Sequence, residues 1–361
     1  MLSKGKTMTN VITLSVPQYR QSLSQRAGTL IDIFANHRRH GDDVFWLKEN
    51  AELLNILECT ATEVPDQTLS LHQDFYDKLP QKLAFFPQYY RFLLSICLDL
   101  EDLGFEGGLG ERLCDWAIAK GLPATELSDL QRGEAHRLLS RRGANLRVDA
   151  GLNERLHQFI NRADTFALPN KKAAYELTHI VFYLSEYGRR DPQLDPQAIR
   201  SLHFVGILAY LDQNADLLAE VCIALRYAGQ SPSAIWEDWV LTTLSDFQAI
   251  GDANADVADA YHEYFVCTWM AATAKNAGDG QVVLTGRTRF ERRDVSPGPL
   301  RSMSKCLLRL EDARSADWIQ MRPLFKQCVD EDGYEILTSV QHSTTEFEAF
   351  FEQFSRIKIA V

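Results

Sequence analysis

Helix-forming segments separated by only a few residues follow one another along most of this 361-residue chain. In its middle, apolar residues recur every three or four positions, and the breaks between these stretches fall at Gly, Pro, Asn, Asp or Ser. The predicted helices there begin after Asn170, Asp195, Asn214 and Ser231, and a fifth spans about 254–277. Connections this short force successive helices to pack antiparallel. We therefore predict an all-α protein, an antiparallel and repeat-like helical array that is a hairpin array, a toroid or a bundle.

Strand-like alternation of β-branched residues occurs in two short places, VITLSV at 11–16 and QVVLTGRTRF at 281–290. This pattern adds at most one small β-ribbon to the helical array, which we expect near residues 281 to 290. The predicted division of the chain follows from these patterns: an N-terminal tail (1–12), an N-terminal helical region (13–168), a central helical region that carries the candidate site (169–278), and a C-terminal region with a short strand and helices (279–361).

The charge balance excludes several classes of partner. Acidic residues outnumber basic ones 49 to 38, and the net charge of −11 opposes attraction to nucleic acid and to anionic lipid. Apolar runs fall far short of the roughly 20 residues of a membrane span, and the first residues lack the apolar core of a signal peptide. Seven dispersed cysteines without a C-x-x-C spacing are typical of reduced thiols. We expect a cytoplasmic protein whose partner is an unknown protein or small molecule.

The candidate site residues are two pairs, each made of a carboxylate and a histidine. Glu176 precedes His179 by three residues, and Asp259 precedes His262 by the same spacing with a shorter side chain. Residues three apart share a helical face, and helix bundles build carboxylate-bridged metal sites from such pairs. Further carboxylates between them suit a site for iron, manganese or zinc. The predicted metal ligands are Glu176, His179, Asp216, Glu220, Asp259 and His262, of which Glu176, His179, Asp259 and His262 are also the predicted catalytic residues.

Simpler interpretations exist for the same residues. A histidine beside a carboxylate, surrounded by Tyr175, Tyr183 and Tyr261, could act as a general base without a metal. Aromatic-flanked histidines also occur as hydrogen-bonded core residues that bind nothing. Elsewhere, we interpret the ANHRRHGDD segment at 35–43 as a solvated helix end with cationic side chains near its C-terminus. The arginines within 287–293 are interleaved with acidic residues and are interpreted as local surface ion pairs.

A resemblance covers roughly residues 170 to 270. The chain there combines YELTHIVFYLSEYG with a D-x-x-x-D-x-x-x-E run at Asp212, Asp216 and Glu220 and with the pair Tyr261 and His262. This combination resembles a pattern of an uncharacterised, predominantly helical bacterial protein family. The resemblance implies no activity, but it does imply that His179 and His262 should be tested together.

The sequence alone favours a non-catalytic interaction or scaffold protein. The alternative is a metal-dependent enzyme, an oxygenase or hydrolase of the di-iron, di-manganese or zinc type, with its carboxylate and histidine site in the central helices. The two hypotheses differ in one spatial requirement. An enzyme requires that the helical faces bearing His179 and His262 turn toward a common cavity.

Overall fold

The computed structural model describes residues 21–41, 43–143, 149–251, 257–275, 283, 285–293 and 297–356. Helices make up most of this part of the chain, and its one sheet has two antiparallel strands. The all-α prediction with one small β-ribbon is therefore confirmed. The predicted strand at 11–16 lies outside the described residues. None of the described helices is long and apolar enough to span a membrane.

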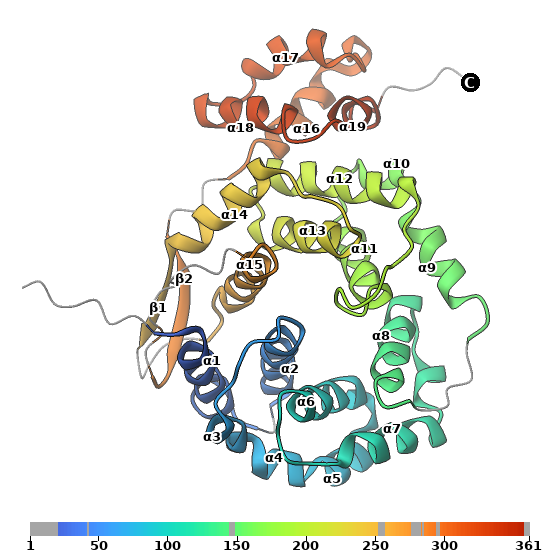
Figure 1. Ribbon diagram of the computed structural model, residues 1–361. Coiled ribbons are helices and arrows are strands. Elements are labelled where there is room, and N and C mark those ends of the chain that lie inside the picture. The colour runs from blue at the N-terminus through green and yellow to red at the C-terminus, as the bar shows by residue number, and fades with distance from the viewer. Residues whose placement is uncertain are drawn as a thin grey trace, which may run out of the picture.

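The helices form a closed ring, or toroid (Figure 1). Each helix that lines its inside contacts the next one around the ring, and the last contacts the first. In chain order, the inner helices are α2 (Val44–Cys59), α6 (Tyr90–Asp102), α8 (Asp129–Ser140), α11 (Lys171–Leu184), α13 (Ala215–Tyr227) and α15 (Tyr261–Thr273). Of the three arrangements that the sequence left open, the structure is the toroid.

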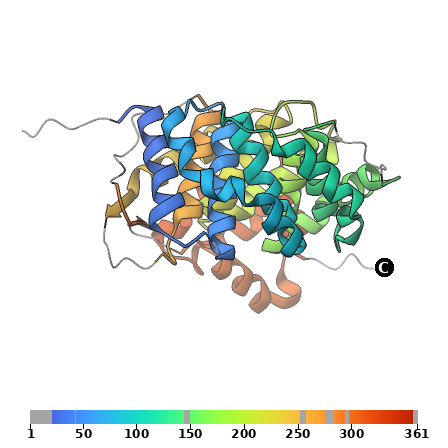
Figure 2. The ribbon, with the colours of Figure 1, turned by 90° about the horizontal axis from the view of Figure 1, so that it is seen from below.

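Outer helices alternate with the inner ones along the chain. They are α1 (Leu23–Asp32), α3 (Asp66–Leu69), α4 (Gln73–Asp77), α5 (Leu79–Phe85), α7 (Leu109–Ala119), α9 (Leu152–Ile160), α10 (Ala163–Phe166), α12 (Pro196–Leu211) and α14 (Ala234–Asp246). Because outer segments carry the chain back between inner helices, the inner helices run parallel to one another (Figure 2). Their N-terminal ends consequently share one face of the ring, and their C-terminal ends share the other.

Side-chain caps explain where several inner helices begin. The side chains of Asp43, Asn170 and Asn214 accept hydrogen bonds from backbone N–H groups in the first turns of α2, α11 and α13. The predicted starts after Asn170 and Asn214 are thus confirmed. The fifth predicted helix is shorter than expected, because α15 begins at Tyr261 rather than near residue 254.

The segment before α15 is held against a β-strand. Strand β1 (Phe247–Gly251) pairs antiparallel with β2 (Thr288–Arg292), with Phe247 opposite Arg292 and Gly251 opposite Thr288. The N–H of Ala260 donates to the carbonyl of Phe290, and the N–H of Phe290 donates to Asp259. These hydrogen bonds compete with helix formation, so Asp259 precedes α15 instead of lying on it.

Arg38 joins both ends of the ring. It follows a π-helical turn (Ile33–His37) at the end of α1, and only 3% of its surface is exposed. Its guanidinium donates to Glu49 on α2 and with two nitrogens to Asp259, at 2.8–3.0 Å. It also donates to the carbonyls of Val257 and Thr288. Every N–H of the guanidinium therefore has an acceptor, and the interpretation of this segment as a solvated helix end is wrong for Arg38.

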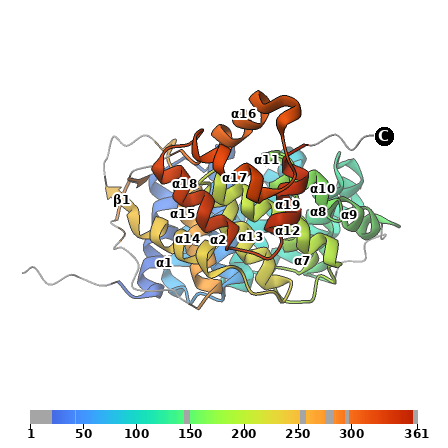
Figure 3. The same cartoon turned by 90° about the horizontal axis from the view of Figure 1, so that it is seen from above.

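The C-terminal helices form a separate layer outside the ring (Figure 3). They are α16 (Leu300–Leu310), α17 (Trp318–Lys326), α18 (Glu331–Gln341) and α19 (Phe347–Phe354). Helices α18 and α19 contact the outer helix α12. Polar contacts add to this packing. The Tyr210 hydroxyl donates a hydrogen bond to the Ser339 hydroxyl at 3.1 Å, and Arg200 Nε pairs with Glu346 Oε2 at 2.8 Å.

Replacing Arg38 with methionine should destabilise the whole ring. Arg38→Met keeps an apolar side chain but removes the cation from the buried Asp259 carboxylate and leaves Glu49 with Arg39 alone. Breaking a buried ion pair in this way typically costs about 3 to 5 kcal/mol. Denaturant unfolding measures this loss. The matched control is Arg132→Met, because Arg132 pairs with Asp129 at the surface, where both side chains are 32% exposed. That variant should lose less than about 1 kcal/mol, and similar losses in both variants would contradict this role for Arg38.

His72 should make the fold sensitive to mild acid. It is 1% exposed, and its Nε2 donates to Asn50 Oδ1 at 3.0 Å, because the Asn50 amide nitrogen is bonded to two carbonyls. Burial lowers the pKa of His72 to about 4. Between pH 6.5 and 4, His72 is protonated in the unfolded chain but stays neutral in the folded chain. The free energy of unfolding therefore falls by about 3 kcal/mol over this range.

The test of the His72 prediction compares the wild type with His72→Gln, whose amide can still donate to Asn50. Denaturant midpoints at several pH values between 7 and 4 should fall less steeply in the variant. All other titrating groups are common to both proteins, so the difference in slope isolates His72. Parallel pH profiles would contradict the prediction.

Candidate functional site

Asp216, Glu220 and His262 come together inside the ring. One ligand atom from each of these residues lies within 4.8 Å of the others. Asp216 and Glu220 are four residues apart in the first turns of α13, so they share one face of that helix. His262 is the second residue of α15, which packs against α13. The cluster therefore lies toward the face of the ring that holds the N-terminal ends of the inner helices.

Each carboxylate of the cluster is oriented by a hydroxyl of α11. The Tyr175 hydroxyl donates to Asp216 Oδ2 at 2.8 Å, and the Thr178 hydroxyl donates to Glu220 Oε2 in a short hydrogen bond. The second oxygen of Asp216, Oδ1, is buried and has no hydrogen-bond partner among the described residues. Each carboxylate thus has one oxygen held by α11 and one left for another interaction.

His262 is also held by a polar neighbour, Glu52 on α2, the inner helix that α15 contacts where the ring closes. Its Nδ1 lies 3.2 Å from Glu52 Oε2 on α2, and its Nε2 lies 3.5 Å from Asp216 Oδ1. A hydrogen bond from Nδ1 to Glu52 leaves Nε2 of a neutral imidazole with its lone pair directed at the cluster. This is the geometry of a histidine whose second nitrogen is available as a ligand.

His179 approaches the same carboxylates from α11. Its Nε2 lies 3.4 Å from Glu220 Oε1, and its ring lies beside those of Phe182 and Tyr183. Although His179 and His262 lie on inner helices, their side chains are 39% and 38% exposed. Both imidazoles therefore line a space that solvent reaches, and both point at the acidic face of α13.

The electrostatics of the cluster reflect its crowded negative charge. Burial lowers the pKa of His262, but the hydrogen bond to Glu52 and the charges of Asp216 and Glu220 outweigh burial and raise the pKa to about 9. Burial and the charge of Glu220 raise the pKa of Asp216 to about 6, against the effect of His262. Loss of hydration on the packed side of the partly exposed imidazole lowers the pKa of His179, but the charge of Glu220 and its contact with the ring outweigh this effect and raise the pKa. The cluster thus attracts positive charge, whether as a proton or as a cation.

Two of the predicted site residues lie apart from this cluster. The Glu176 carboxylate is 3.9 Å from Lys172 Nζ on its own helix, and both oxygens of Asp259 accept hydrogen bonds from Arg38. The structure therefore does not build the site from two carboxylate-x-x-histidine pairs. It combines the carboxylates of Asp216 and Glu220 with histidines from the two neighbouring inner helices.

Glu52 and Thr178 are site residues that the sequence patterns did not indicate. Glu52 lies 210 residues before His262, and a single sequence contains no local signal that joins them. Thr178 lies inside the YELTH segment next to His179. Its role could have been suspected from that motif, but its partner Glu220 could not.

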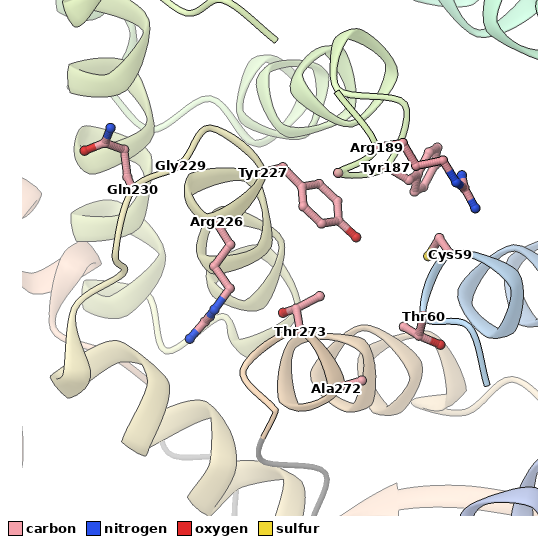
Figure 4. Close-up of a pocket in the computed structure, with 11 residues that line it drawn as sticks. Cys59, Thr60, Tyr187, Arg189, Arg226, Tyr227, Gly229, Gln230, Ala272 and Thr273 are labelled. Atoms are coloured by element: carbon pink, nitrogen blue, oxygen red, sulfur yellow. The ribbon is translucent and has the colours of Figure 1, made fainter. Parts of the chain in front are cut away.

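A cavity of about 600 Å³ opens at the opposite face of the ring (Figure 4). It is lined by residues at or beyond the C-terminal ends of inner helices, including Tyr187, Arg189, Arg226 and Tyr227. Both arginines already pair with glutamates, Arg189 with Glu58 and Arg226 with Glu237. Tyr227 follows Glu220 by seven residues on α13, a helical rise of about 10 Å. We therefore place the candidate site at the cluster and not in this cavity.

The fold and the cluster define a class of protein: a helical toroid with carboxylates and histidines gathered inside the ring. The chain belongs to the family described as "Domain of unknown function (DUF6902)", whose model matches residues 8–357. This match confirms membership of an uncharacterised family and extends it from the central region to nearly the whole chain. No curated protein and no solved structure matches the chain.

Proposed function

We propose that the ring binds one divalent metal ion through Asp216, Glu220 and His262 and that the protein is a metal-dependent hydrolase. One observation carries this proposal: a polar neighbour holds one side of each of these three groups, and one ligand atom of each group lies within 4.8 Å of the others. Hydrogen bonds that hold the outer atoms of ligands are typical of protein metal centres.

The donor atoms fit a transition metal. Two carboxylate oxygens and one imidazole nitrogen suit zinc, manganese or iron. The buried Asp216 Oδ1, which has no hydrogen-bond partner among the described residues, would gain one ligand bond. A single ion is favoured over a pair of ions, because Glu176 and Asp259, the carboxylates expected to complete a dinuclear site, have other partners.

His179 is the residue best situated for proton transfer. A divalent ion held by these residues would supply Lewis-acid chemistry: it would polarise a substrate oxygen and make a water molecule more acidic. His179 lies beside Glu220 on the solvent-accessible side of the cluster, and it could accept the proton of an attacking water. Because both imidazoles are more than one third exposed, water is available as the second reactant. This access favours a hydrolase over an oxygenase.

The enzyme hypothesis replaces the scaffold as our preferred interpretation. Burying charged groups inside a ring costs free energy, and the raised pKa of Asp216 reflects that cost. Clusters of perturbed titratable groups are characteristic of functional sites. A scaffold would instead use the outside of the ring. The partner we propose is therefore a small molecule that enters the ring, and neither nucleic acid nor a membrane.

Metal content tests this proposal directly. Protein purified without an affinity tag and reconstituted with Zn²⁺ or Mn²⁺ should retain about one ion per chain after extensive dialysis, because three protein ligands hold it. Asp216→Asn and His262→Gln should lose the ion, as measured by elemental analysis. Glu176→Gln is the matched control and should retain it. An ion-free wild type, or equal retention in His262→Gln, would leave the scaffold as the better hypothesis.

His179→Gln should separate metal binding from catalysis. The variant keeps the three ligands, so its metal content should match the wild type, while the turnover number should fall by about 10²- to 10⁴-fold through loss of a general base. Chromogenic carboxylic esters, phosphoesters and amides are suitable substrates for this comparison. If the metal-loaded wild type hydrolyses none of them, the hydrolase assignment is contradicted even though the metal site stands.

A further inference from the structure

Two cysteines in the C-terminal layer are in direct contact. Cys306 lies on α16, and Cys328 follows the end of α17 by two residues. Their Sγ atoms are 2.7 Å apart, although the residues are separated by 22 positions in the sequence. Cys306 is 3% exposed, whereas Cys328 is partly exposed. Two cysteines that are far apart in the sequence therefore meet in the fold.

The surroundings of the two sulfurs give them different accessibility. Cys306 packs in the core of the layer, with its thiol 4.0 Å from the Leu324 carbonyl. Burial and the neighbouring Cys328 raise the pKa of Cys306 to about 12. A buried thiol with a raised pKa is rarely present as the reactive thiolate. An external reagent would therefore react first with Cys328, which is more accessible.

We propose that Cys306 and Cys328 form a reversible disulfide by exchange with a low-molecular-weight disulfide such as glutathione disulfide. The Cys328 thiolate attacks one glutathione sulfur, which forms a mixed disulfide and releases the first glutathione. The Cys306 thiolate then attacks the Cys328 sulfur, forms the intramolecular disulfide and releases the second glutathione. Two cysteine thiols are oxidised, one glutathione disulfide is reduced to two thiols, and the two protons pass to the released glutathiones.

The disulfide would join α16 to the end of α17 within the C-terminal layer. Helices α18 and α19 contact α12, while α16 and α17 pack on one another and α17 packs on α19. Trp318 on α17 contacts the rings of Phe347 and Phe351 on α19. A covalent bond between α16 and the end of α17 reduces the conformational freedom of the unfolded layer and so stabilises the folded layer. The candidate metal ligands are on other helices, so metal content should not change.

The experiment equilibrates the full chain in glutathione buffers graded from fully reduced to fully oxidised. After acid quenching, free thiols are counted in denaturant, and peptides are mapped by mass spectrometry. Oxidation should remove two of the seven thiols, lower the mass by two hydrogen atoms, and yield one cross-linked peptide that contains Cys306 and Cys328. The midpoint temperature of thermal unfolding should rise on oxidation.

Single variants make the test specific. Cys328→Ser should form no intramolecular disulfide, and its thermal midpoint should not respond to oxidation. Cys59→Ser removes another partly exposed thiol and should oxidise as the wild type does. The proposal is overturned if the fully oxidised buffer produces no cross-link, a mixed disulfide that persists on Cys328, or a cross-link between other cysteines. The thiol count is independent of metal binding, so its failure is distinguishable from failure of the proposed function.

Discussion

The buried guanidinium of Arg38 is the interaction on which the ring depends. A closed ring of helices needs contacts between its first and last members, and here these are the contacts between α2 and α15. Arg38 supplements them by binding Glu49 on α2, Asp259 before α15 and the carbonyl of Thr288 on β2. One side chain thereby joins three segments that are distant in sequence and satisfies two carboxylates that burial would otherwise penalise.

The same closure aligns the candidate site. Glu52 follows Glu49 by three residues on α2, and His262 follows Asp259 by three residues at the start of α15. Arg38 binds the first member of each pair, and the second members lie 3.2 Å apart. Asp259 therefore belongs to the ring closure beside the candidate site and is not a member of the cluster itself. The three-residue spacing from Asp259 to His262 matches the spacing from Glu49 to Glu52, so that each residue of one pair faces a residue of the other across the closure of the ring.

Helix positions could be predicted from the sequence, because apolar periodicity and capping residues act over a few positions. The two histidines named from the sequence lie beside carboxylates of α13, and their role stays a prediction. Asn170 and Asn214 mark helix starts that the structure confirms. Partners far apart in the chain could not be predicted. Arg38 has the local appearance of a solvated helix end, and its burial depends on segments more than 200 residues away. The position of Asp259 before α15, beside β2 and Arg38, could not be predicted for the same reason.

The order in which the chain is synthesised limits when the ring can close. Arg38 and its partner Asp259 are 221 residues apart, so the closure forms only after the ribosome has delivered most of the polypeptide. Until then, the Arg38 guanidinium lacks Asp259 and the carbonyls of Val257 and Thr288 as acceptors. Contacts of such long sequence separation form slowly. The ring therefore cannot close before synthesis has passed Asp259 and Thr288, which come late in the chain.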